Sequence, residues 1–452
     1  MLSSRLPKDL SPSPFFAELE RVKAQVSAET ARGEGLPFID MTVSSPVKAG
    51  LPVEMDAAVE SARSGFGCWN PDAAGWKSAR EAVVEYYRER GGNFTAGQIL
   101  LTASTSEAYS VLFKTFCDPG DVILTPMPGY PLLDTLAQLE HLECAPYFLQ
   151  LRRENARKLA ADERREGAAF RFVLDTDSLL AAPEKAKILL LVSPHNPTGH
   201  CISREEWNAA VRFCEENDMV LVVDEVFGDY GFSEKVSRTW KYVFGVCHPE
   251  PSLSQSSPSK SFSTEGRESI HCRFNDFWDA GGNDLINLPE DGPKCPIFWL
   301  NGLSKAVGSP QLKLGWMAFY APREHFEEIR AALEFVEDAY LSVSAPAQAL
   351  GMSLLPKASA YEAQVKDRLL ANWQTLRESF PAKYCPEVLG GWYAVVRLGE
   401  DDEELTLRLL QEKHVLVQPG FFFDFDEDGW VVISLLQEPA IFKEAVRRMA
   451  DR

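Results

Sequence analysis

The chain is short of basic residues and of long apolar runs, and each shortage excludes a class of partner. Its 46 lysines and arginines are outnumbered by 66 aspartates and glutamates, which gives a net charge of −20. Nucleic acids and anionic membranes bind basic faces, so we expect this chain to bind neither. No apolar run approaches the roughly 20 residues that a membrane-spanning helix needs, so no membrane segment is expected.

Paired cysteines are also missing. The nine cysteines are odd in number, lie scattered along the chain and contain no CxxC pair. This pattern indicates neither a disulfide framework nor a zinc site, so no metal is expected. The N-terminal residues contain no apolar stretch of the signal-peptide kind. We therefore expect a reduced, cytoplasmic setting.

Short apolar runs alternate with helical patterns through the middle of the chain. This alternation predicts βαβ units and a mostly parallel sheet. No GxGxxG pattern follows an early strand, which argues against a plain NAD-binding domain. The runs predicted to be strands are 99–102, 122–125, 188–192, 220–223, 297–300 and 315–319.

After about residue 320 the pattern changes to helices that enclose short strands, which predicts a smaller α+β domain. The predicted helices are 324–337, 357–380, 403–413 and 439–451, and the predicted strands are 392–397, 415–418 and 430–435. We expect an insertion at 232–296, where the serine-rich stretch 252–263 has the composition of a mobile loop. The predicted parts are an N-terminal arm with part of the small domain (1–48), a large domain (49–322) and a small C-terminal domain (323–452).

Three polar residues each lie just past a buried strand: Asn196 in the motif PHNPTG, Asp224, and Lys305. Because ligands of α/β sheets bind at the carboxyl ends of strands, we expect these side chains to lie together. A pyridoxal phosphate (PLP) site needs an amine for the aldehyde, an anion for the ring nitrogen and a donor for the phenolic oxygen. The three residues supply these groups in one chain.

Each of these residues also has a purely structural interpretation. Lys305 could be a surface lysine at the start of a helix, and Asp224 could cap a helix or join an ion pair. The Pro-Thr-Gly that follows Asn196 is typical of a turn, and Glu225 is a weaker candidate than Asp224. The occurrence of all three signatures in this order favours the PLP site.

On these signatures the chain resembles the fold-type I PLP enzymes of the class I/II aminotransferase family, from about Ile39 to the C-terminus. The resemblance implies an aspartate-aminotransferase-like fold. Such a fold has a large, doubly wound, mostly parallel α/β domain that binds PLP, a smaller α+β domain made from both chain ends, and a homodimeric assembly. It also implies that Lys305 forms the Schiff base and carries the proton, that Asp224 pairs with the ring nitrogen, and that Asn196 donates to the phenolic oxygen.

Other positions match the family by motif. Tyr130, in PMPGYP, matches the aromatic residue that stacks on the cofactor. Ser104, Thr105 and Ser106 open a helix predicted to follow a strand, and the free N–H groups of a helix N-terminus form a phosphate site. Ser304, beside the lysine, is also expected to contact the cofactor.

The chain departs from the family pattern at several cofactor contacts. Phe227 replaces a tyrosine that donates to the phenolic oxygen, which should raise the pKa of the Lys305 Schiff base. Gly302 stands where a serine often contacts the phosphate. Lys313 replaces an arginine there, which keeps the charge but loses the bidentate fork. Trp69 replaces a tyrosine that reaches the partner subunit's phosphate.

The largest departure concerns the substrate carboxylate. Relatives hold this group with an arginine in the last strand, where this chain has Val432, and no arginine lies between Arg408 and Arg447. Lys48, with the nearby Ser45, is a candidate replacement in the substrate-side loop, and is equally well explained as a solvated lysine. Either the carboxylate is held differently, or the substrate is not a standard α-amino acid.

The resemblance implies transfer of an amino group from an amino acid or related amine to a 2-oxo acid. A PLP-dependent lyase that catalyses β- or γ-elimination is the alternative, since it would use the same lysine, aspartate and asparagine. A third hypothesis is a non-catalytic PLP-binding regulator. The 35 N-terminal residues are too few for a helix-turn-helix module, and the acidity opposes DNA contact.

Overall fold

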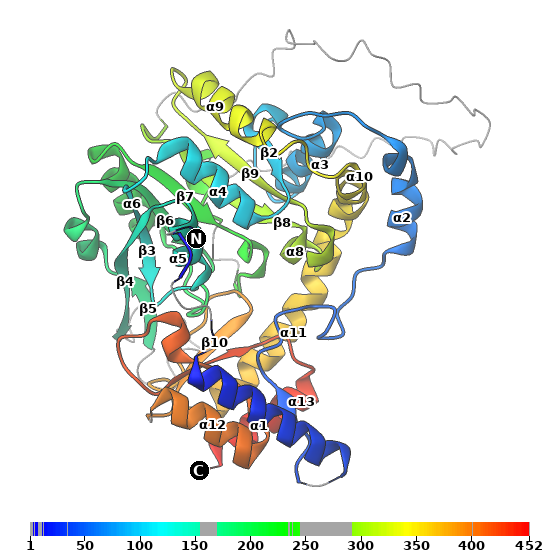
Figure 1. The fold of residues 1–452 in the computed structure, drawn as a ribbon, viewed down its shortest axis with the longest axis vertical. Coiled ribbons are helices and arrows are strands. Elements are labelled where there is room, and N and C mark those ends of the chain that lie inside the picture. The colour runs from blue at the N-terminus through cyan, green and yellow to red at the C-terminus, as the bar shows by residue number, and fades with distance from the viewer. Residues whose placement is uncertain are drawn as a thin grey trace.

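The computed structural model contains one large sheet and two small ones within the part of the chain that it describes (Figure 1). The described residues are 3, 5–7, 11, 13–33, 35–153, 170–233, 236, 238–244, 292–399 and 401–451. Most of the expected insertion at 232–296, including its serine-rich stretch, lies outside these residues.

The large sheet lies at the centre of the molecule. Its described strands are, in spatial order, β2 (Ile99–Thr102), β9 (Gly315–Tyr320), β8 (Ile297–Gly302), β7 (Val220–Asp224), β6 (Ala186–Val192), β3 (Val122–Met127), β4 (Glu143–Arg153) and β5 (Phe170–Leu174). The strands from β8 to β4 are parallel to their neighbours, while β9, β2 and β5 are antiparallel to theirs. The sequence predicted all of these except β4 and β5, whose mixed buried and exposed residues give no continuous apolar run.

Alternate residues of the central strands enter two separate apolar layers. In β6, Ile188 and Leu190 face one layer, whereas Leu189 and Leu191 face the other. A strand buried on both faces needs apolar residues at every position, which explains the unbroken apolar runs of the sequence. One layer is closed by α4 (Thr105–Phe116), α5 (Leu132–Leu139) and α9 (Phe326–Asp338), and the other by α3 (Lys77–Arg88) and α6 (Arg204–Glu216). The large unit is therefore doubly wound.

The N-terminal helix and the C-terminal part of the chain lie together below the large sheet (Figure 1). There, β1 pairs with β11 and α1 packs against α12, while β10, β13 and β12 form an antiparallel sheet. The elements are α1 (Pro14–Ala31), β1 (Ile39–Asp40), β10 (Tyr393–Arg397), α12 (Asp402–Lys413), β11 (Val415–Leu416), β12 (Gln418–Pro419), β13 (Trp430–Ser434) and α13 (Pro439–Ala450). Helices and short strands from both the N-terminal and the C-terminal part of the chain therefore lie together in this smaller unit.

A long helix connects the two halves. The predicted helix 357–380 is α11 (Ala358–Ser379), which packs against α13. The sequence did not predict α10 (Ala345–Leu354), which lies just before it and packs on α2 (Asp56–Ala62). No helix among the described residues has the length and apolarity needed to cross a membrane.

The start of α6 has a capping box. The Ser203 hydroxyl accepts from the Glu206 N–H at 3.2 Å, and the Glu206 carboxylate accepts from the Ser203 N–H at 2.7 Å. The other oxygen of Glu206 lies 3.1 Å from Nε2 of His200, a buried residue at the end of the PHNPTG loop. The cap therefore also fixes the loop that follows β6.

A buried charged cluster supports the end of β8. The Asp229 carboxylate accepts from Nε of Arg90 at 2.8 Å, from Nη1 of Arg238 at 3.0 Å and from the Tyr86 hydroxyl at 2.6 Å. Burial acts to raise the pKa of Asp229, but the two guanidinium groups hold it below its usual value. The Tyr86 hydroxyl in turn accepts from Asn301, next to the last residue of β8.

We expect the variant Asp229→Ala to lose about 3–5 kcal/mol of unfolding free energy, because two largely buried guanidinium groups would lose the carboxylate that they share. Urea denaturation measures this loss. The matched control is Glu60→Ala, which breaks the exposed pair with Arg63 and should barely move the midpoint. Equal midpoint shifts in the two variants would contradict a stabilising role for the buried cluster.

Candidate functional site

A cavity of about 320 Å³ lies at the carboxyl edge of the large sheet. The register pairs Val192 of β6 with Asp224 of β7, and Asp224 with Leu300 of β8. Because these strands are parallel neighbours, the residues that end or follow them share one edge of the sheet. Asn196, Asp224 and Lys305 all line the cavity.

Most of the residues predicted for the site line this cavity. They are Ser104, Thr105, Ser106, Tyr130, Asn196, Asp224, Ser304 and Lys305. Four predicted residues do not line it, namely Ser45, Lys48, Trp69 and Lys313. Ser44 lines it in place of its neighbour, and the side chains of Lys48 and Trp69 are exposed on the chain's surface. Lys313 directly precedes two lining residues and has a left-handed backbone, with φ of 51°.

The Lys305 amine lies against two aromatic rings. Its Nζ is 5.3 Å from the ring centroid of Phe227 and 4.6 Å from that of Trp392. Burial lowers the pKa of Lys305 to about 8, and the Asp224 carboxylate offsets only part of this effect. The Lys305 carbonyl accepts from the Tyr230 hydroxyl at 2.6 Å, which fixes the backbone of the residue. A neutral amine, the nucleophilic form, is therefore easier to reach than in an exposed lysine.

The Asp224 carboxylate is held by two donors. It accepts from the Tyr109 hydroxyl at 2.6 Å and from the Val226 N–H at 3.0 Å. Burial raises the pKa of Asp224, although both hydrogen bonds and the charge of Lys305 act against the rise. The sequence reasoning missed Tyr109. Its position three residues after Ser106 on α4 puts both side chains on one helix face, which was the available signal.

Glu225 faces away from the cavity. Its carboxylate accepts from the N–H and hydroxyl of Thr239 at 2.7 and 2.6 Å, and lies 3.1 Å from Nε of Arg238. Successive side chains of a strand point to opposite faces, so only one acid of the Asp-Glu pair can face the ligand. The preference for Asp224 over Glu225 agrees with this geometry.

Asn196 presents an unpaired polar atom to the cavity. Its Oδ1 is buried and has no hydrogen-bond partner within the described part of the chain. A buried polar group without a partner costs free energy, and as an acceptor Oδ1 could be satisfied by an N–H or O–H of a ligand. The group of this amide that could hold a cofactor oxygen is its donor, Nδ2.

The N-terminus of α4 offers donors for an anion. Ser104 caps the helix, with its hydroxyl accepting from the Glu107 N–H at 3.2 Å. The first amides of the helix have no intrahelical partner, and the hydroxyls of Thr105, Ser106 and Ser304 line the same cavity. These groups fit a phosphate. In the described ranges, no group of three or more histidine, cysteine, aspartate or glutamate side chains is arranged to hold a metal ion.

Close packing explains the glycine at position 302. A Cβ added to Gly302 would lie 3.0 Å from the Gly315 Cα and 3.0 Å from the Leu314 carbonyl oxygen. The serine that relatives often carry here would require β9 to move away. The departure at Gly302 therefore follows from the tight contact between β8 and β9.

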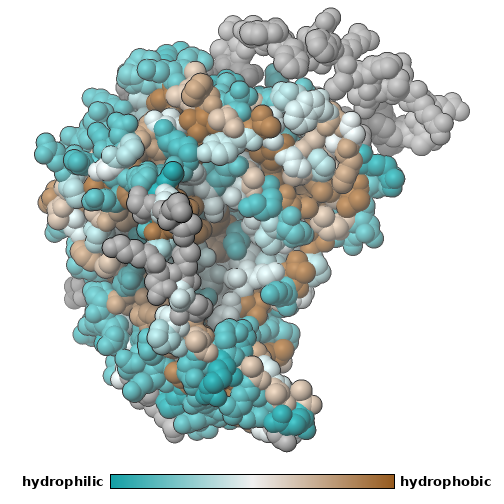
Figure 2. Space-filling model, viewed as in Figure 1, coloured by the Kyte–Doolittle hydropathy of each residue, from teal (hydrophilic) through white to brown (hydrophobic). Residues whose placement is uncertain are grey.

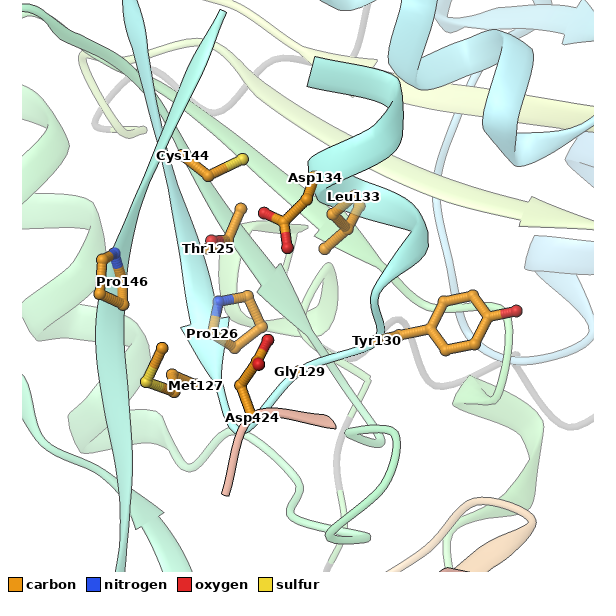
Figure 3. Close-up of a pocket in the computed structure, with 10 residues that line it drawn as sticks. All are labelled: Thr125, Pro126, Met127, Gly129, Tyr130, Leu133, Asp134, Cys144, Pro146 and Asp424. Atoms are coloured by element: carbon orange, nitrogen blue, oxygen red, sulfur yellow. The ribbon is translucent and has the colours of Figure 1, made fainter. Parts of the chain in front are cut away.

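Tyr130 lies between the main cavity and a smaller one of about 110 Å³. Figure 3 shows its ring pointing away from Asp134 and Asp424, which line the smaller cavity. The Gly129 N–H donates to the Phe423 carbonyl at 2.8 Å, so the C-terminal part of the chain holds this loop. The ring is therefore positioned by contacts from both halves of the molecule.

The sequence also missed the aromatic residues that the small unit brings to the site. Trp392 contacts the lysine, and Tyr393 lines the cavity. The segment before them is tied to the large unit, because the Leu389 N–H donates to the Gly199 carbonyl and the Gly391 N–H to the Tyr230 carbonyl, each at 2.9 Å. No local pattern signals these long-range contacts.

Comparison with known proteins agrees with this geometry. The chain is 22% identical over 438 residues to the glutamate-pyruvate aminotransferase AlaA of Haemophilus influenzae, covering 92% of this chain and 91% of that protein. It is also 22% identical over 411 residues to the S-alkyl-thiohydroximate lyase SUR1 of Arabidopsis thaliana, covering 87% of this chain and 74% of that protein.

The fold agrees as well. The crystal structure of an aspartate aminotransferase from Thermotoga maritima matches with a TM-score of 0.70 and 18% identity, covering 100% of this chain and 99% of that one. The sequence profile described as aminotransferase class I and II matches residues 50–268 and 271–449. Since this match spans most of the chain, the protein belongs to the class I and II aminotransferase family.

Proposed function

We propose that this aminotransferase moves an amino group between an amino acid or related amine and a 2-oxo acid, with PLP held in the cavity at Lys305. The observation that carries the proposal is one cavity in which a lysine amine of lowered pKa faces a buried carboxylate. When bound, PLP supplies an aldehyde for the amine and a ring that withdraws electrons from the reacting carbon.

The residues that line the cavity would each have a separate role in binding the cofactor or in proton transfer. Lys305 would hold the cofactor through its amine, and the same amine would carry the proton to and from the reacting carbon of the substrate. Asp224, oriented by Tyr109, would pair with the ring nitrogen, which would also give this buried carboxylate the partner that it needs. The Asn196 amide would donate to the phenolic oxygen, and the Tyr130 ring would stack on the cofactor.

The phosphate contacts are the N-terminal amides of α4 with the hydroxyls of Ser104, Thr105, Ser106 and Ser304. We propose that the side chain of Lys313, which precedes the lining residues Leu314 and Gly315, adds a positive charge near the phosphate. The left-handed φ of this residue costs an L-residue about 1–2 kcal/mol. Such strain at a non-glycine residue beside a site supports a functional reason for keeping the lysine.

We also propose a homodimer. Trp69 is 75% exposed, and Val59 and Phe66 nearby in the sequence are exposed as well. Figure 2 shows apolar residues gathered on the side of the molecule that carries α2 and α10. An exposed apolar patch of this kind is typical of a protein interface, and a second copy is the partner that the family resemblance implies.

The first prediction concerns the amino donor alone. With protein loaded with PLP and no acceptor present, a suitable donor should bleach the visible absorption band and release one equivalent of 2-oxo acid per site. Lys305→Ala should slow this step by about 10³-fold or more, because the proton carrier is lost. Lys185→Ala removes an exposed lysine and serves as the matched control. Continued ammonia release with the band retained would instead indicate the lyase.

The second prediction concerns the pH dependence of cofactor capture by the empty protein. Only the neutral amine attacks the aldehyde, so the capture rate should rise with pH and level off above about 8, the pKa of Lys305. Asp224→Asn removes the charge that raises this pKa and should move the plateau to lower pH. A rate that keeps rising to about pH 10, as for an exposed lysine, would contradict the buried amine.

A further inference from the structure

Apart from Lys305, the cavity is lined by hydroxyl, apolar and other uncharged groups and by the Asp224 carboxylate, with no second positive charge. The hydroxyl and apolar lining residues include Ser44, Tyr130, Leu132, Leu133, Phe227 and Tyr393. Among the described residues that line the whole cavity, Lys305 is the only one with a cationic side chain. In the proposed function this amine is committed to the cofactor and to proton transfer, so it cannot also neutralise a substrate carboxylate.

The last strand supplies no cation either. Val432 lies in β13, fully buried, and pairs with Val395 on one side and Gln418 on the other. It belongs to the main apolar core and does not line the cavity. The position at which relatives place their arginine is therefore closed by apolar packing.

Neutral hydroxyl groups line the cavity instead. Burial, with a smaller contribution from Tyr130, raises the pKa of Tyr393 to about 12, although a hydrogen bond with the Ser44 hydroxyl acts against the rise. Tyr393 therefore keeps its proton at neutral pH and can donate it to a ligand. Its ring packs edge-on against Phe227, with the ring centroids 5.9 Å apart.

These observations bear on which substrates the cavity favours. Moving a carboxylate out of water costs several kcal/mol unless a cation and hydrogen-bond donors compensate. An uncharged amide or ester carbonyl loses much less hydration, and hydroxyl donors satisfy it fully. A pocket lined by neutral hydroxyl groups therefore does not favour free amino acids over their amides or esters, as a pocket with a cation would.

Resting on the proposed function, we propose that Tyr393 and Ser44 recognise the substrate through neutral hydrogen bonds. Amines that carry an uncharged carboxamide or ester beside the reacting carbon are then accepted at least as well as the free amino acids. The acceptor that regenerates the cofactor would be the corresponding 2-oxo compound.

Equilibrium binding tests this proposal without catalysis. Calorimetry on the PLP-loaded enzyme would compare the unreactive ligands 3-phenylpropanoate and 3-phenylpropanamide. We expect the amide to bind at least as tightly as the acid, whereas a cation paired with the carboxylate would favour the acid by about tenfold or more. A preference of that size for the acid would overturn the proposal.

A variant of Tyr393 tests whether its hydroxyl makes the hydrogen bond to the ligand. Tyr393→Phe should weaken the amide by about 3–10-fold, the worth of one hydrogen bond, while leaving 2-phenylethylamine unchanged. The matched control is Tyr320→Phe, whose hydroxyl donates to the Pro293 carbonyl in another part of the large unit. An unchanged amide affinity in Tyr393→Phe would overturn the assignment. If the wild type prefers the acid, Lys48→Gln shows whether that lysine or another cation is the clamp, and either result contradicts the proposal.

Donor kinetics separate this proposal from the proposed function. L-Phenylalanine and L-phenylalaninamide would each be mixed with the loaded enzyme, and bleaching of the visible band followed. We expect the amide to react at least as efficiently as the acid. If neither donor bleaches the band although 3-phenylpropanamide binds at least as tightly as 3-phenylpropanoate, transamination fails while the neutral pocket stands. Bleaching by the acid alone overturns the neutral pocket and leaves transamination intact.

Discussion

The site depends on the attraction between two opposite charges that the fold removes from water. Asp224 ends β7 and Lys305 follows β8, and these neighbouring parallel strands carry both groups to one edge of the sheet. Burial opposes both charged forms, raising the pKa of the carboxyl group and lowering that of the amine. Each group therefore needs a partner in the cavity, and a cofactor with a cationic ring nitrogen and an aldehyde provides one for each.

The surrounding structure keeps this pair in place. Tyr109 holds the carboxylate from α4, and Tyr230 holds the backbone of the lysine. The Asp229 cluster fixes the end of β8, shortly before Lys305 in the chain. Charged groups that do not contact the ligand therefore help to set the position of the lysine. Apart from the Lys305–Asp224 pair, the same cavity is lined by uncharged residues, many of them with aromatic rings or hydroxyl groups.

Much of this arrangement could be predicted from the sequence, because the signals are local. Asp224 and Lys305 follow unbroken apolar runs, and the two-sided burial of the central strands explains why those runs are unbroken. Tyr109 could have been found from its helical spacing to Ser106. Tyr393 could not, because backbone hydrogen bonds to the loops after β6 and β7 carry it to the cavity from far along the chain. The strands β4 and β5 were not predicted because their residues are only partly buried and form no continuous apolar run.

The central claim is that Lys305, and no other lysine, holds the cofactor. Borohydride reduction of the PLP-loaded protein makes the attachment permanent, and mass spectrometry of the digested chain then locates it. The account predicts a phosphopyridoxyl group on Lys305 in nearly every molecule and its loss in Lys305→Ala. Attachment mainly to Lys48 or Lys313, or equal labelling of many exposed lysines, would contradict the account.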